Sequence, residues 1–362
     1  MRSPAANIVQ DINDIPSPYL NGVFDLKKYR VVDLLLSRGC KWRCSYCIIG
    51  ENPLRYFSFD RIKAELEVLV KKAPELSTIS LITTDLLENE KFALKLLPLM
   101  REISWKRGIK FIFDINVNSL SARNIELMKL LNCADFEAEI GVQSRNNEVL
   151  FSCGRPGSKG IEEGFELLKK HAPGLSVTIG IIRGLPGDDI NGYKNALSWV
   201  FSTGYDLQVR HLRILPGSRL EKNKKQYGIE IIKKYPYFVS SVNTIPRKNM
   251  LKMVRLTEDA CFSYKMIRMS KALKDNFLTS ASELKNNSEY PHLEFAEKFT
   301  IWLGKSRKFG KIYRDYNQKR KSETLDWELD YGSFENVSLR ALLVEFVKFK
   351  SSWKATKPAG KR

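Results

Sequence analysis

The chain has 362 residues, a formal net charge of +19 and a hydrophobic fraction of 43%. This length predicts one large domain or two ordinary ones, and no apolar stretch reaches the roughly 20 residues that a membrane-spanning helix needs. Six cysteines in a chain of this size do not indicate a disulfide framework. We therefore expect a cytoplasmic protein without a signal peptide or a membrane association.

Apolar β-rich segments alternate with amphipathic helical segments from residue 30 to about residue 216. This alternation is typical of βα units around a parallel sheet, and it predicts an α/β fold with a partial (βα)6 barrel. Strands are expected at residues 31–36, 77–82, 110–115, 136–142, 176–182 and 207–214. Helices are expected at residues 60–73, 89–107, 121–132, 159–171 and 188–203.

The segments on either side of this alternation have a different character. Residues 1–29 contain many turn formers and predict an extended lead-in to a barrel at 30–220. Residues 221–362 predict a mainly helical, basic region that covers the barrel mouth, with helices at 247–275, 291–304 and 337–350. Its basic runs favour an anionic partner, nucleic acid or an acidic polypeptide, although a solvated basic face would have the same composition.

Three cysteines, Cys40, Cys44 and Cys47, follow the first predicted strand with the spacing C-x3-C-x2-C. A closed zinc site, or an iron-sulfur cube held by protein alone, needs four ligands, and this loop offers three thiols and no histidine. One coordination position is left for another ligand. The alternatives are a zinc site completed by a distant residue and chance clustering.

The cysteine loop resembles that of the radical S-adenosylmethionine (SAM) enzymes. The resemblance implies a 4Fe-4S cluster on Cys40, Cys44 and Cys47, with SAM on the fourth iron. It also implies reductive cleavage of SAM to a 5′-deoxyadenosyl radical, which abstracts hydrogen from a substrate carbon. Such an enzyme needs an electron donor such as flavodoxin or ferredoxin.

Later segments resemble the SAM-binding strands of this family, in particular of its oxygen-independent coproporphyrinogen oxidases. Gln143 and Arg155 keep the spacing of a glutamine that contacts the SAM ribose and an arginine that pairs with the SAM carboxylate. A guanidinium suits that task because it offers a bidentate fork and stays charged. The resemblance implies contacts near the SAM amino end for Asp85 and Asp114, which could equally be ordinary loop starters. It also implies that Ser144 lies near the ribose.

The segment 179–189 resembles the family's G-L-P-G turn, which packs near adenine. It implies adenine contacts from Ile181 and Gly184. The oxidases place a ribose-binding aspartate where this chain has Gly180. The ribose contact is therefore expected from Gln143 and Ser144.

Segments 16–20, 37–40 and 212–220 resemble the radical SAM half of enzymes that usually carry a cobalamin-binding domain before it. The resemblance extends over about residues 11–256. Because the chain begins at that half, we expect cobalamin-linked methyl transfer only if a partner supplies the cobalamin.

Two further residues are candidates for a role at the substrate. Peptide epimerases of the family quench a carbon radical with a cysteine thiol, and Cys261 on a predicted helix is the first candidate for that role, ahead of Cys153. A free cysteine can equally be a small buried hydrophobe. His211 is expected either to line the substrate cavity or to face the surrounding helices.

Three functional hypotheses follow. The first is modification of a ribosomally synthesised peptide or other natural product, for example by epimerisation, with the basic C-terminal region binding an acidic leader. The second is small-molecule or methyl-transfer chemistry with cobalamin from a partner. The third is a basic RNA-binding module whose cluster is structural or serves RNA modification, and in which Phe309, Tyr313 and Tyr316 beside the basic run would stack on bases.

Overall fold

The computed structural model describes residues 9–283, 288–306, 309–320 and 338–355. Its main sheet has six strands in the order β1-β4-β5-β6-β7-β8, and the pairs β1–β4, β4–β5 and β5–β6 are parallel. The α/β class predicted from the alternating pattern is confirmed. The six strands are β1 (Val31–Leu35), β4 (Thr78–Ile82), β5 (Lys110–Asn116), β6 (Phe136–Gln143), β7 (Ser176–Arg183) and β8 (Asp206–His211).

Helices connect the strands at the predicted places. Their starts follow local capping: the Ser58 side chain accepts a hydrogen bond from the Arg61 amide, and Asp189 accepts one from the Gly192 amide. The third helix starts later than predicted because residues 122–124 form a 3-10 turn. The connecting helices are α1 (Phe59–Lys72), α2 (Glu90–Arg107), α3 (Ile125–Leu131), α5 (Ile161–His171) and α6 (Ile190–Thr203).

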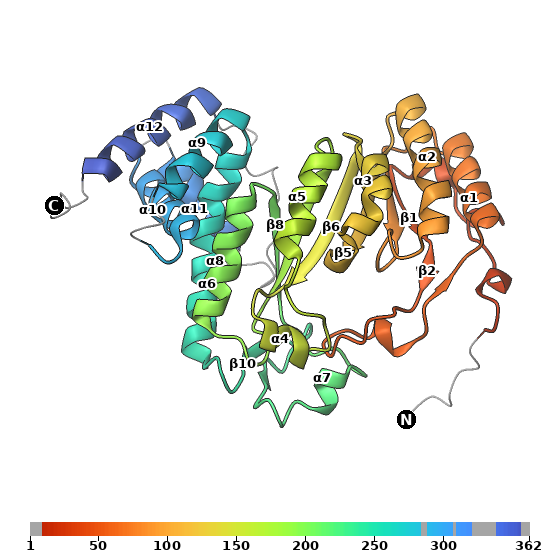
Figure 1. Cartoon of the computed structure of the whole chain (residues 1–362), viewed down its shortest axis with the longest axis horizontal. Coiled ribbons are helices and arrows are strands. Elements are labelled where there is room, and N and C mark those ends of the chain that lie inside the picture. Colours follow the sequence, from red (N-terminus) through yellow and green to blue (C-terminus); the bar gives the residue numbers. More distant parts are fainter. Residues whose placement is uncertain (1–8, 284–287, 307–308, 321–337, 356–362) are drawn as a thin grey trace. The chain divides into compact units, whose positions relative to one another are not determined.

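The chain divides into two compact units, and the first holds the described residues up to Val142 together with Gly154–Thr178. Helices α1, α2, α3 and α5 pack side by side in that order within this unit (Figure 1). The strands bury every second side chain, as Leu34, Leu81 and Phe113 illustrate. The predicted boundaries at residues 29 and 220 stay a prediction.

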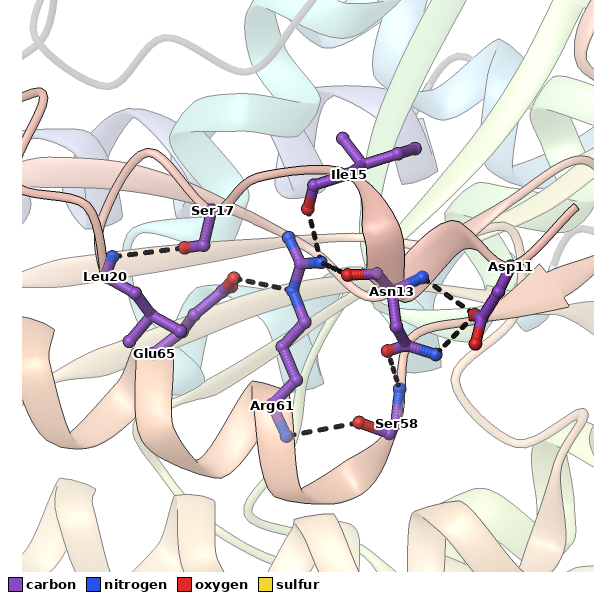
Figure 2. A network of polar contacts seen from close by, with 8 residues as sticks. All are labelled: Asp11, Asn13, Ile15, Ser17, Leu20, Ser58, Arg61 and Glu65. Atoms are coloured by element: carbon purple, nitrogen blue, oxygen red, sulfur yellow. Dashed lines mark hydrogen bonds and ion pairs between the residues drawn. The ribbon is translucent and has the colours of Figure 1, made fainter. Parts of the chain in front are cut away.

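The lead-in before β1 is fastened to α1 by Arg61, as Figure 2 shows. The Arg61 Nη1 atom donates to the carbonyl oxygens of Asn13 (2.9 Å) and Ile15 (2.6 Å), and its Nε atom donates to Glu65. The Ser58 amide donates to the Asn13 side chain. The lead-in therefore has a defined path along the helix instead of being only extended.

The second unit holds Gln143–Cys153 and the described residues from Ile179 onward. Its longest helix, α8 (Arg247–Arg268), packs against α6 and against α10 (Pro291–Lys305). A cluster of rings fills the space between the later helices: Phe277, Phe295, Phe299, Phe346 and Phe349. The other helices of this unit are α4 (Asn147–Ser152), α7 (Arg219–Lys222), α9 (Lys271–Ser282), α11 (Gly310–Arg320) and α12 (Leu339–Ala355).

Two parts of the C-terminal prediction need correction. The helix predicted at 247–275 is two helices, because Ser270 is extended (φ −139°, ψ 130°) between α8 and α9. The short hairpin of β9 (Glu230–Ile231) and β10 (Val239–Ser241) was not predicted. In the part of the chain that the structure describes, no helix is long and apolar enough to cross a membrane.

Candidate active site

The cysteine loop leaves the sheet at the carboxyl end of β1. A two-stranded hairpin of β2 (Ser37–Arg38) and β3 (Arg55–Tyr56) closes its base. Gly39 has φ +80°, and a Cβ atom there would overlap the carbonyl oxygen of Pro53. Only glycine fits this position, so the two ends of the loop can approach closely.

Each of the three cysteine sulfurs accepts a hydrogen bond. The Trp42 amide donates to Cys40 Sγ (3.3 Å), and the Ile49 amide donates to Cys47 Sγ (3.4 Å). The third donor is a side chain, because Arg155 Nη1 lies 3.7 Å from Cys44 Sγ. Hydrogen bonds to sulfur stabilise the thiolate form that iron requires.

The three thiols also influence one another. Burial raises the pKa of Cys47, the Ile49 and Gly50 amides lower it, and the charges of Cys44 and Cys40 raise it further. Among the described residues, no three His, Cys, Asp or Glu side chains are already gathered as a metal-binding group. The donor set, three thiols supplied with N–H groups, fits a cluster with three thiolate ligands, and the assignment itself stays a prediction.

Arg155 lies beside this loop although it is more than a hundred residues away in sequence. Its Nη2 atom donates to the Gly141 carbonyl at the end of β6 (2.7 Å), and its Nη1 atom also donates to the Tyr46 hydroxyl (3.3 Å). Burial alone would lower the pKa of Arg155, but Tyr46 and Cys44 raise it, so the guanidinium stays charged. The sequence reasoning missed Tyr46, although its position between Cys44 and Cys47 was a usable signal.

Asp85 follows β4 and is 2% exposed. Its Oδ2 atom accepts a hydrogen bond from the Ser119 hydroxyl (2.5 Å), and its Oδ1 atom accepts one from the Leu87 amide (3.1 Å). Burial raises the pKa of Asp85 to about 6 against the lowering effect of these bonds. Asp114, by contrast, has an exposed side chain, and its carbonyl oxygen accepts from the Leu86 amide.

A polar cavity of about 260 Å³ lies between the cysteine loop and the loops after β4 and β5. Two ion pairs, Lys41 with Glu88 and Arg123 with Glu90, lie among its lining residues. Ser119, the partner of Asp85, also lines it. The complete lining is Lys41, Leu87, Glu88, Glu90, Asn118, Ser119, Ser121, Arg123 and Asn124.

The remaining predicted SAM contacts belong to the second unit. Gln143 ends β6 with φ +70°, an uncommon backbone angle for a residue with a side chain. The buried Ser144 accepts a hydrogen bond from the Asn146 amide. Ile181 is fully buried, and Ile182 occupies the opposite face of β7. Gly184 has φ +95° and starts the turn after β7.

Cys261 and His211 are also in the second unit, and both are enclosed. Cys261 is fully buried on α8, close enough to Tyr193 that its charge affects the pKa of that phenol. Its role as a hydrogen donor stays a prediction, as does that of Cys153, which is also buried. Both ring nitrogens of His211 are bonded, one to Arg183 and one to the Val239 carbonyl. This favours the alternative in which His211 does not line a cavity.

The stacking role predicted beside the basic run is contradicted for Phe309, whereas Tyr313 is half-buried. Phe309 is 1% exposed. Tyr313 donates from its hydroxyl to Asp259 and packs its ring against Phe262 at 5.0 Å. The side chains of Tyr316, Arg307, Lys308 and residues 319–321 lie outside what the structure describes. The burial of Phe309 weakens the sequence support for RNA stacking.

Residues 34–199 match the family model described as the radical SAM superfamily. The cobalamin-dependent radical SAM methyltransferase TokK of Streptomyces tokunonensis is 26% identical over 255 residues, which cover 65% of this chain and 37% of TokK. The ribosomal protein uS12 methylthiotransferase RimO of Acetivibrio thermocellus is 27% identical over 191 residues, which cover 48% of this chain and 40% of RimO. The chain thus spans about two fifths of the length of these curated relatives.

Solved structures show a weaker likeness. The methyltransferase TsrM of Kitasatospora setae, with cobalamin and a [4Fe-4S] cluster bound, has a TM-score of 0.47 and 14% identity over 80% of this chain and 61% of that chain. The coproporphyrinogen III oxidase HemN of Escherichia coli has a TM-score of 0.45 and 18% identity over 70% of this chain and 57% of that chain.

Proposed function

We propose that this protein, a radical SAM enzyme whose family domain lies at residues 34–199, cleaves SAM reductively and takes part in methyl transfer to its substrate. The observation that carries the proposal is that all three cysteine sulfurs accept N–H hydrogen bonds. The curated relatives are named as a methyltransferase and methylthiotransferases, and these names favour the methyl-transfer hypothesis over peptide epimerisation.

The cysteine loop would hold the cluster. Cys40, Cys44 and Cys47 would be its three ligands, and the cluster, when bound, supplies the electron for SAM cleavage. The Trp42 and Ile49 amides would remain on the sulfurs, where such donors raise the reduction potential of an iron-sulfur site. The chain thereby contributes ligands and the electrostatic environment, and the chemistry belongs to the cofactor.

Arg155 would bind the SAM carboxylate. The Gly141 carbonyl already fixes one Nη atom, so the guanidinium is oriented before a ligand arrives and loses little freedom on binding. Asp85 would accept the SAM ammonium group, because a carboxyl with a pKa of about 6 is mostly ionised at neutral pH. Asp114 would lie on the same side of the sheet end and add to this negative charge.

The second unit would bind the nucleoside. Gln143 and Ser144 are proposed for the ribose, at the point where β6 turns toward α4. Ile181 and Gly184 are proposed for the adenine, at the end of β7. These assignments come from the resemblance of the strands.

Two partners follow from the proposed chemistry. Methyl transfer of this kind would require cobalamin as a partner, because the relative TokK is named as a cobalamin-dependent methyltransferase. An electron donor such as flavodoxin or ferredoxin would reduce the cluster. Exposed Lys41 and Arg43 in the cysteine loop, and exposed Ile48 and Ile49 next to Cys47, offer such an acidic carrier a basic and partly apolar contact surface.

The experiment measures both products that SAM can give. Cluster-reconstituted protein is incubated anaerobically with SAM and dithionite, with and without hydroxocobalamin. We expect 5′-deoxyadenosine in both samples, and S-adenosylhomocysteine only with cobalamin. The first product reports reductive cleavage, and the second reports methyl donation.

Two cysteine variants complete the test. Cys44→Ala should abolish 5′-deoxyadenosine formation and the iron-sulfur absorbance, whereas Cys133→Ala, outside the loop, should preserve both. Absence of 5′-deoxyadenosine from the wild-type protein would overturn the proposal. Its formation without S-adenosylhomocysteine in the presence of cobalamin would remove methyl transfer and leave SAM cleavage standing.

A further inference from the structure

A buried guanidinium joins several elements of the second unit. Arg183, the last residue of β7, is 1% exposed. Its Nε atom donates to His211 Nδ1 at the end of β8 (2.9 Å), and its Nη1 atom donates to the Thr257 hydroxyl of α8 (2.9 Å). The Tyr193 hydroxyl of α6 lies 2.5 Å from the same Thr257 oxygen. Arg183 and Thr257 together thus connect β7, β8, α6 and α8.

The protons of this cluster have a single consistent arrangement. Because Arg183 donates to His211 Nδ1, the His211 proton is on Nε2, which donates to the Val239 carbonyl (2.7 Å). Burial and the charge of Arg183 lower the pKa of His211 to about 3, so the ring is neutral at any working pH. The histidine therefore acts as a fixed link between β8 and β10.

The Thr257 hydroxyl also uses all of its hydrogen-bonding positions. Its hydroxyl donates to the Met253 carbonyl (2.7 Å) and accepts from Arg183, so the remaining bond must come from Tyr193 as donor. Burial raises the pKa of Tyr193 to about 12, which keeps that phenol protonated. We define the cluster as Arg183, Tyr193, His211 and Thr257; within it, Thr257 and His211 have defined donor and acceptor roles.

The same helix also touches the next residue of the chain. Gly184 begins the turn after β7 with φ +95°, and a Cβ atom there would come within 2.9 Å of Met250 Cε. Met250 and Thr257 both belong to α8. Helix α8 therefore contacts the start of the turn through Met250 and holds the preceding residue through Thr257.

We propose that Arg183 is a positioning residue, through which α8 sets the geometry of the turn at Gly184–Gly187 and thereby the affinity for SAM. This rests on the proposed function, in which that turn contacts adenine. A turn held at one end by buried hydrogen bonds loses less conformational freedom when a ligand binds, and this gain is expressed as affinity. Arg183 itself need not touch SAM.

The test compares two buried threonines. Thr257→Val removes the hydroxyl that binds Arg183, and Thr300→Val removes one that links α10 to α8 without involving β7. We expect Thr257→Val to raise the Kd of the cluster-loaded protein for SAM about 10-fold, and Thr300→Val to leave it within about twofold. Both variants should lower the melting temperature by similar amounts, because each leaves buried partners unsatisfied.

Further variants and a second readout separate positioning from stability. Thr257→Ser keeps the hydroxyl and should restore the wild-type Kd, while Arg183→Lys keeps the charge but not the two-atom fork and should weaken SAM binding. Hydrogen exchange of residues 184–189 in the SAM-free protein should be faster in Thr257→Val than in Thr300→Val. Equal exchange and an unchanged Kd in Thr257→Val would overturn the inference.

The outcome for the wild-type protein keeps the two proposals apart. Wild-type protein that neither binds nor cleaves SAM would refute the proposed function, together with the part of the inference that concerns SAM. Wild-type protein that binds SAM, with a Thr257→Val variant of equal affinity, would refute the inference alone.

Discussion

The two compact units each contain an arginine that is largely enclosed, and the partners of these arginines differ in kind. Arg183 in the second unit bonds to a neutral imidazole and a hydroxyl. Arg155 in the first unit bonds to a thiol and a phenol of the cysteine loop and to the Gly141 carbonyl oxygen of β6. A cluster ligand is a thiolate, so Cys44 would carry negative charge beside Arg155, whereas the Tyr193 phenol beside Arg183 stays protonated because burial raises its pKa to about 12.

This difference separates a framework arginine from a ligand-binding one. Neutral partners with all their hydrogen-bonding positions used, as around Arg183, stabilise one arrangement and gain nothing from an added anion. Partners that can ionise, as around Arg155, indicate a place where negative charge is expected, such as a thiolate or a bound carboxylate. The chemistry of the partners, more than burial, therefore identifies the functional arginine.

The largest effect on stability should come from breaking the framework arginine. Arg183→Met should lower the free energy of unfolding by about 4 kcal/mol, because it leaves buried His211 and Thr257 groups without their donor. Guanidinium chloride unfolding measures this. Arg268→Met, which removes a more exposed ion pair to Asp206 in the same unit, should cost less than half as much. If the two variants lost the same unfolding free energy, burial of Arg183 would not be the cause of its larger contribution to stability.

The sequence predicted the sheet because its signals are local. The apolar alternation of residues 77–82 and 110–115 is readable without any tertiary contact. The capping residues Ser58 and Asp189 were identified only in the structure. The three cysteines could likewise be recognised from spacing alone. Two of their hydrogen-bond donors, Trp42 and Ile49, lie within two residues of them, whereas Arg155 is 111 residues from Cys44.

The Arg183 cluster could not be predicted, since its members come from separate elements of the chain. Arg183 and Thr257 are 74 residues apart, and only the packing of α8 brings them together. The burial of Phe309 has a similar cause: a layered set of helices buries more than one face, so composition does not tell which aromatic residues remain exposed. The break at Ser270 was missed because the apolar pattern continues on both sides of it.

Asp85 in the first unit is a buried acidic residue whose hydrogen-bond partners, the Ser119 hydroxyl and the Leu87 amide, are neutral. Its pKa is raised from the model-compound value of 3.8 to about 6, so the folded protein binds this proton more tightly than the unfolded chain. The contribution of Asp85 to the free energy of unfolding is therefore most favourable below pH 4. It falls by about 3 kcal/mol in total as the pH rises through 6. Asp85→Asn should remove that fall.

The measurement is the difference in unfolding free energy between Asp85→Asn and the wild type, taken from pH 4 to pH 7.5. As the pH rises, the wild type should lose unfolding free energy relative to the variant until Asp85 is largely ionised, near pH 6.5. Above that pH the difference should stay nearly constant. Asp188, whose pKa burial raises to about 7, titrates in both proteins and cancels. If the plots of unfolding free energy against pH were parallel for the two proteins, the ionised form of Asp85 would not destabilise the fold. Its assignment to the SAM ammonium group would then be weakened.

The smallest of the three effects should be the most specific. Arg155→Gln should raise the Kd for SAM about 30-fold, or about 2 kcal/mol, the value of hydrogen bonds to a charged group, with little change in unfolding free energy. Arg61→Gln is the matched control, since it removes a guanidinium that bonds backbone carbonyls and Glu65 in the same unit. It should lower stability and leave SAM affinity unchanged. If Arg155→Gln behaved like Arg61→Gln, the distinction between ionisable and neutral partners would fail, and Arg155 would be a framework residue like Arg183.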